Sequence, residues 1–126
     1  MIYFFQFQDF IGNAQELADA ALECASRHNW LIDADKTNER LVRYYVTVQV
    51  LDKPNRVGRD ASYQYRHLLQ LLIARRMLDK GFNLATIAEH NQKASTSELA
   101  EKLISRDLEI TDAQALIKKF TSSSSN

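Results

Sequence analysis

Cysteine, proline and glycine are scarce in this sequence. One Cys, one Pro and three Gly occur among its 126 residues. A single cysteine, Cys24, excludes an internal disulfide and a thiolate metal site, so we interpret it as a small apolar residue on a helix. Because proline and glycine interrupt helices, their scarcity and the abundance of good helix formers predict a mainly α-helical fold.

The sequence also lacks a long hydrophobic run. No apolar stretch approaches the roughly 20 residues that cross a bilayer, and the first residues have neither the basic start nor the apolar core of a signal peptide. We therefore expect a cytoplasmic protein without membrane contact. With 45% hydrophobic and 25% charged residues, the composition is typical of a globular domain.

Motifs for catalysis and for metal binding are missing as well. His28, His67 and His90 lie far apart in the sequence and lack the i, i+4 spacing of a helical metal pair. The sequence contains no Gly-rich phosphate loop, nucleophile elbow or paired carboxylate motif. We therefore expect no enzymatic activity, no cofactor and no metal site.

The charges are unevenly distributed, although the net charge is zero. Ten Lys and Arg but only four Asp and Glu lie between positions 36 and 80, and the flanks hold the other six basic and twelve acidic residues. A basic middle attracts polyanions, whereas the acidic flanks repel them. The distribution indicates a nucleic-acid partner, with a merely solvated charged surface as the alternative.

Hydrophobic spacing predicts the elements of the first half. We expect a short strand over residues 2–8 and a helix from Asn13, with a capping box to Glu16, to about His28. Residues 29–36 then form a connector whose apolar side chains pack beneath the domain. A second helix follows, capped by Thr37 or Asn38.

The second helix has an apolar side and a polar side. Its inward side is predicted to consist of Leu41, Val42, Tyr45 and Val46, with Val48 as a further candidate. Its outward side consists of Arg40, Arg43, Tyr44 and Thr47. After it, Pro54, Asn55, Gly58 and Asp60 predict a turn. Val50-Leu51 could pair with Ala61-Ser62-Tyr63 as a hairpin, or wing, with Lys53, Arg56 and Arg59 near its tip.

The second half is predicted to be helical. A strongly apolar helix runs from Tyr65 to Lys80-Gly81, and a short helix capped by Asn83 ends near His90. Ser95 or Thr96 with Glu98 caps another helix, and Thr111 begins a last one. We expect a DNA-binding domain with an N-terminal extension over residues 1–92, dimerising helices over 93–120 and a disordered tail over 121–126.

Several segments resemble the MerR family of regulators. They are Leu41-Val42-Arg43-Tyr44-Tyr45, Val50-Leu51-Asp52-Lys53-Pro54, Gly58-Arg59, Tyr63 and the run from Arg75 to Ile87. The resemblance covers roughly residues 37–90. It implies a winged helix-turn-helix with a small β-hairpin wing and additional C-terminal helices, whose second helix enters the major groove.

Two features depart from that family. The connector over residues 29–36 replaces the usual tight turn between the first two helices, and the C-terminal part has neither the cysteine pattern of the metal sensors nor a ligand-binding domain. Effector sensing is therefore not expected. In size and layout the chain is similar to the small effector-free repressors that accompany CRISPR-associated transposons.

Nine residues are predicted to contact DNA. They are Arg40, Arg43, Tyr44, Thr47, Lys53, Arg56, Arg59, Tyr63 and Arg66. Arg40 and Arg43 suit base edges in the groove, and Tyr44 suits the sugar-phosphate backbone. The wing arginines, with Tyr63 and Arg66, would bind phosphates beside the groove. Arg75 and Arg76 either join them or form the solvated side of a core helix, and Tyr45 is expected in the core.

The predicted function is sequence-specific regulation of transcription, with a dimeric repressor occluding a promoter. Its partner is double-stranded DNA with a pseudo-palindromic operator, read by a homodimer. The dimer would form through Leu99, Leu103 and Ile104 and through Leu116, Ile117 and Phe120, unless these helices fold back on their own core. The alternatives are an architectural or excisionase-like DNA-bending protein and a protein-interaction module.

Overall fold

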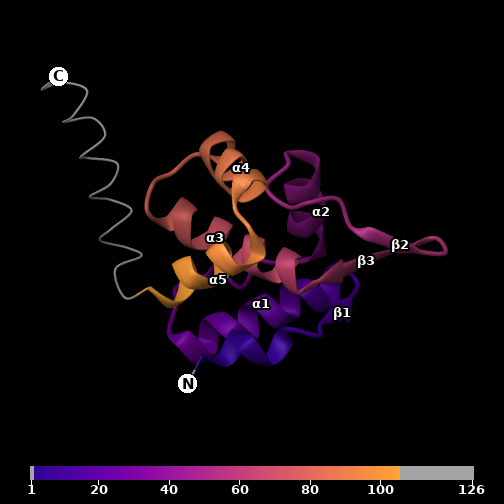
Figure 1. Ribbon diagram of the computed structural model, residues 1–126, viewed down its shortest axis with the longest axis horizontal. Coiled ribbons are helices and arrows are strands. Elements are labelled where there is room, and N and C mark those ends of the chain that lie inside the picture. Colours follow the sequence, from indigo (N-terminus) through magenta and orange to yellow (C-terminus); the bar gives the residue numbers. More distant parts are fainter. Residues whose placement is uncertain (1, 106–126) are drawn as a thin grey trace, which may run out of the picture.

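The computed structural model describes residues 2–105, which form a mainly helical body with a small sheet at one side (Figure 1). In chain order the elements are the 3-10 helix η1 (Tyr3–Phe7), strand β1 (Ile11–Gly12), helices α1 (Ala14–His28) and α2 (Glu39–Thr47), strands β2 (Asn55–Val57) and β3 (Asp60–Gln64), and helices α3 (Tyr65–Asp79), α4 (Leu84–Lys93) and α5 (Thr96–Ile104). The predicted fold class, mainly α with a β-hairpin wing, is confirmed. The predicted helix from Thr111 and the tail lie outside the described residues.

Short polar side chains begin the helices at the predicted positions. At α1 the Asn13 side chain accepts from the Glu16 backbone N–H at 2.8 Å, and the Glu16 carboxylate accepts from the Asn13 N–H at 2.9 Å. Asn38 caps α2, Asn83 caps α4, and Ser95 with Glu98 forms a second capping box at α5. These bonds satisfy backbone donors that a helix N-terminus leaves unpaired.

Helix α3 forms the centre of the core. Its residues from His67 to Ala74 are all buried, and α1, α4 and α5 pack against it. The α5 side chains Leu99 and Leu103 belong to this core, so the dimer contact predicted for them is wrong. Ile104 is the exposed member of that set.

The sheet has three antiparallel strands in the order β1-β3-β2. Val57 pairs with Asp60 and Asn55 pairs with Ser62, so the β2–β3 hairpin has a two-residue turn at Gly58 and Arg59. Gly58 has a φ of +66°, which glycine adopts without steric cost. At the other edge of β3, Ile11 pairs with Gln64 and Gly12 with Tyr63.

The hairpin is shorter at its base than predicted. Val50 and Leu51 do not pair with β3; both are buried, and their backbone N–H groups donate to the Tyr45 carbonyl at 2.9 Å and 3.1 Å. They therefore complete the C-terminal end of α2. Burial of these two side chains in the core outweighs the strand pairing that their apolar character indicated.

The N-terminal segment is a 3-10 helix and not the predicted strand. Phe4 is buried and its ring lies 5.6 Å from that of His28 and 6.3 Å from that of Trp30, while the Tyr3 N–H donates to His28 Nε2 at 3.2 Å. Packing on the end of α1 thus decides the conformation. In the connector, Trp30 and Ile32 pack on the core as expected, but Leu31 is 85% exposed.

Candidate nucleic-acid interface

Helix α2 divides into a buried side and an exposed side as the sequence predicted. Val42 and Tyr45 are buried, and the Tyr45 hydroxyl accepts a hydrogen bond from Arg75 Nη1 at 3.0 Å. All four predicted outward residues are exposed: Arg40, Arg43, Tyr44 and Thr47. The outward side therefore presents two guanidinium groups, a phenol and a hydroxyl to solvent.

The β2–β3 hairpin projects from the body beside α2 (Figure 1). Residues 55–60 are all exposed, and Arg56 Nη1 donates to the Arg59 carbonyl across the hairpin at 3.0 Å. Lys53 is exposed just before the hairpin. Since the hairpin tip buries nothing, core packing does not explain its arginines.

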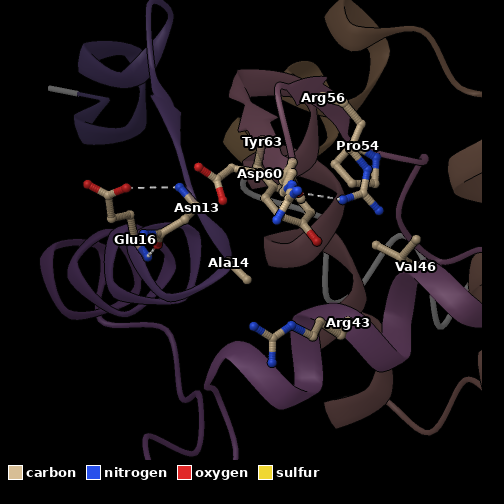
Figure 2. Close-up of a pocket in the computed structure, with 11 residues that line it drawn as sticks. Asn13, Ala14, Glu16, Arg43, Val46, Pro54, Arg56, Asp60 and Tyr63 are labelled. Carbon is tan, nitrogen blue, oxygen red and sulfur yellow. Dashed lines mark hydrogen bonds between the residues drawn. The ribbon is translucent and has the colours of Figure 1, made fainter.

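A groove of about 690 Å³ separates the hairpin from α2 and from the N-terminal end of α1. It is lined by Asn13, Ala14, Glu16, Arg43, Val46, Pro54, Arg56, Arg59, Asp60, Ala61 and Tyr63. Figure 2 shows Arg43 reaching from α2 toward the space between α1 and the hairpin. Three arginines from two elements therefore line one groove.

The groove also contains two carboxylates. The Glu16 carboxylate accepts from the Asn13 backbone N–H in the capping box, so it already serves the start of α1. Asp60 ends the hairpin turn and begins β3. Three guanidinium groups against two carboxylates leave the groove with an excess of positive charge, which favours an anionic ligand.

Tyr63 lies at the floor of this groove and not on its rim. The residue is only 2% exposed, and its ring packs edge-on against His67 at 5.2 Å between centroids. Burial raises the pKa of Tyr63, against an opposing effect of the nearby Arg43 and Arg56 charges. Tyr63 therefore packs mainly in the core, although it also lines the groove.

Arg66 forms contacts within the fold, whereas the sequence predicted that it binds a phosphate of DNA. Its Nε donates to Asp52 Oδ2 at 2.6 Å, and its Nη2 donates to the carbonyls of Asn91 and Ala94 at 3.1 Å and 2.8 Å. Nη1 donates to Thr96 Oγ1 at 3.3 Å. The guanidinium thus joins the loop after α2 to the α4–α5 junction, and we do not include it in the interface.

Asp52 is the acceptor at the centre of this cluster. Its Oδ1 accepts from Gln70 Nε2 at 3.0 Å and from Gln92 Nε2 at 3.2 Å, besides the bond from Arg66. Burial raises the pKa of Asp52, but the hydrogen bonds from Gln70 and Arg66 and the Arg66 charge outweigh it, so the pKa is lowered. An ionised Asp52 therefore fixes the end of α2 and the start of the hairpin against α3 and α4.

The two arginines left open by the sequence, Arg75 and Arg76, have structural roles. Arg75 binds the Tyr45 hydroxyl as described, and Arg76 is buried with its guanidinium carbon 4.4 Å from the centroid of the Trp30 ring. Such cation–π packing holds the connector on α3. Neither arginine lines the groove.

The described residues contain no cluster of three or more His, Cys, Asp and Glu side chains suited to a metal ion. Cys24 is buried, and burial raises its pKa to about 12, so it is a protonated, apolar side chain.

Over residues 2–105 no helix has the length and apolar character needed to span a membrane.

A comparison with known families adds an independent observation. Residues 36–93 match the family model of the MerR HTH family regulatory proteins. This MerR-like segment contains α2, the hairpin, α3 and α4, and it leaves out α1 and α5. The match supports a MerR-type helix-turn-helix and, with it, DNA-binding regulation of transcription. No curated protein and no solved structure matched the chain.

Sequence reasoning missed three residues at or beside the site. The α1 residues Asn13 and Glu16 line the groove because β1 pairs with β3, a tertiary contact that no local pattern shows. Glu39 forms an ion pair with Arg43 on the MerR-like segment, Oε2 to Nη2 at 3.0 Å. The i, i+4 spacing of these opposite charges was a visible signal for that pair.

Proposed function

We propose that this protein is a sequence-specific DNA-binding regulator of transcription that inserts α2 into the major groove and places the β2–β3 hairpin on the neighbouring backbone. The observation that carries the proposal is the convergence of Arg43, Arg56 and Arg59 on one groove between these two elements. The match of residues 36–93 to a family of regulatory proteins supports the same conclusion. As a cytoplasmic regulator it would have direct access to a promoter.

The two elements suit different parts of a duplex. A helix whose outward side carries Arg40 and Arg43 can present bidentate donors to guanine edges, with the Tyr44 hydroxyl as a donor to the backbone. The Thr47 hydroxyl donates to the Arg43 carbonyl at 3.1 Å and would exchange this bond for one to a phosphate. The hairpin presents Arg56 and Arg59, and the segment just before it presents Lys53, without a packed apolar surface around them. Cations on such a projection neutralise phosphates, for which charge matters more than the geometry of the side chain.

We further propose that the protein binds DNA as a homodimer on a pseudo-palindromic site. One winged helix reads only a few base pairs, and two copies related by a two-fold axis double the contacts. The buried Leu99 and Leu103 are excluded from the dimer contact. The predicted contact through Leu116, Ile117 and Phe120 falls outside the described residues and stays part of this proposal.

In this proposal the bound protein represses transcription by occluding a promoter. A dimer bound to a promoter covers DNA that RNA polymerase must contact. Repression of this kind needs only DNA binding and therefore no effector. A reporter gene behind a site selected by this protein should lose expression when the protein is produced. Increased expression from that reporter would contradict repression while leaving DNA binding intact.

The test of DNA binding starts from a duplex selected from a randomised library by the parent chain. Fluorescence anisotropy then measures binding of the selected duplex and of a random duplex at several salt concentrations, for the parent, Arg43→Ala and Arg59→Ala. We expect Arg43→Ala to lose preference for the selected duplex. Arg59→Ala should weaken binding to both duplexes and reduce the log–log salt slope by about 0.9, as for one lost phosphate contact.

Arg27→Ala is the matched control for the loss of one positive charge. Arg27 is exposed in the last turn of α1, whereas the groove is lined by residues at the start of that helix, and its guanidinium lies 5.0 Å from the centroid of the Tyr3 ring. This variant should bind DNA as the parent does. Equal binding by all three arginine variants would contradict the interface, and the absence of salt-sensitive binding by the parent would contradict the function.

A further inference from the structure

One ion pair lies on the outward side of α2. Glu39 is the first residue of the helix and Arg43 lies one turn later, with 3.0 Å between Glu39 Oε2 and Arg43 Nη2. The Arg43 and Glu39 side chains are 67% and 48% exposed, respectively. Because exposed i, i+4 pairs contribute little to stability, the consequence of this pair lies in where it holds the Arg43 guanidinium.

We infer that Glu39 is a specificity-determining residue that positions Arg43 for a guanine edge and disfavours the binding of Arg43 to a phosphate. The inference rests on the DNA-binding function proposed above and assigns a role within that interface. Glu39 does not line the groove itself, so it acts through Arg43, which does.

The first part of the argument is geometric. An arginine has five N–H donors in a rigid planar fork, and the bond to Glu39 uses one nitrogen of that fork. The pair therefore fixes the orientation of the plane while donors remain for the O6 and N7 acceptors of guanine. First-turn residues of a groove-inserted helix are those that approach base edges, and Glu39 lies in that turn.

The second part is electrostatic. A phosphate close enough to bind Arg43 would also lie close to the Glu39 carboxylate, because the two side chains are in contact, and like charges repel. A guanine edge is neutral and meets no such repulsion. The same pair therefore penalises binding to the backbone of any sequence and leaves recognition of a G·C pair favourable.

Other interface arginines lack this arrangement. Arg56 donates to the Arg59 carbonyl, which is neutral, and within residues 2–105 neither Arg40 nor Arg59 forms an ion pair. Among the interface arginines of the described part of the chain, Arg43 alone forms an ion pair with a carboxylate. This difference separates Arg43 from the hairpin arginines Arg56 and Arg59, which are proposed to bind phosphates.

The experiment measures Kd for the selected duplex, for versions of it with each base pair replaced, and for a random duplex. We expect Glu39→Gln to bind the random duplex more tightly than the parent and to lose discrimination at one G·C position per half-site by at least about fivefold. Glu39→Asp keeps the charge but shortens the side chain, so it should lose discrimination without tighter random binding. In the Arg43→Ala background, Glu39→Gln should cause no further loss of discrimination.

Glu101→Gln is the matched control, since it removes one exposed carboxylate from α5, outside the interface. It should leave both affinity and discrimination at the parent's values, and circular dichroism should show that every variant folds. If Glu39→Gln strengthens binding to all duplexes by one common factor, Glu39 is only a repelling charge and the inference is wrong. If the parent itself shows no sequence preference, the proposed function fails instead, so the two failures are distinguishable.

Discussion

Replacing Arg66 by alanine tests whether this residue holds the fold together or contacts DNA. Its guanidinium donates to Asp52, to Thr96 and to the carbonyls of Asn91 and Ala94. Removing one partner of a buried ion pair costs about 3–5 kcal/mol. The Arg66 and Asp52 side chains stay 27% and 33% exposed, so water replaces part of the lost bonds, and we expect the free energy of unfolding to fall by about 2–3 kcal/mol.

Urea denaturation at pH 7, followed by Trp30 fluorescence and far-UV circular dichroism, measures this change. Arg40→Ala is the matched control because Arg40 is exposed and, among residues 2–105, forms no hydrogen bond or ion pair through its side chain; its free energy of unfolding should change by less than about 0.5 kcal/mol. A double-mutant cycle with Asp52→Ala should show strong coupling to Arg66.

The DNA-binding readout of Arg66→Ala completes the test. At a temperature where the variant stays folded, its salt slope should equal that of the parent. A stability loss below about 1 kcal/mol, together with a slope reduced by about 0.9, would identify Arg66 as a phosphate contact. That result would refute the structural role and restore the interpretation drawn from the sequence.

Three further predictions concern stability. Asn38→Ala removes the α2 cap and should lower the free energy of unfolding by about 1 kcal/mol in urea titration, with no change for Asn38→Asp as a control. Leu99→Ala should cost about 2–5 kcal/mol in the same assay without altering the oligomeric state in sedimentation, whereas a shift toward monomer would show that Leu99 belongs to a subunit contact. Because folding lowers the pKa of Asp52, its contribution to stability is fully present above the unfolded value of 3.8 and is lost as pH falls below it; Asp52→Asn should weaken this acid dependence, and an unchanged pH profile would contradict it.

Local features of the fold were predictable from the sequence. Asn13 and Asn83 cap their helices by bonding backbone groups within three residues, so the pattern alone identifies them. Ser95, which caps α5, was one of two adjacent candidates, with Thr96. Gly81 ends α3 with a φ of +94°, as its position after Lys80 indicated. The outward side of α2 followed from helical periodicity, which is equally local.

Features that depend on distant contacts were not predictable. Phe4 and its neighbours alternate as a strand would, but packing on His28 and Trp30 favours a 3-10 helix. Arg66 carries the same charge as the wing arginines, and only the tertiary position of Asp52, fourteen residues away, gives it a different role. Charge and spacing show which residues can bind an anion. They do not show which cationic side chains already bind a carboxylate within the fold.

The separation of core and surface along the chain affects how readily recognition can change. In α2 only Val42 and Tyr45 are buried, and the hairpin from 55 to 60 buries none of its residues. Burial is concentrated in α3 instead, where every position from His67 to Ala74 is buried. Surface substitutions away from caps and networks change stability little. The outward residues of α2 and the hairpin residues other than Gly58, whose positive φ favours glycine, can therefore be randomised in a library for new target sequences while the scaffold stays folded.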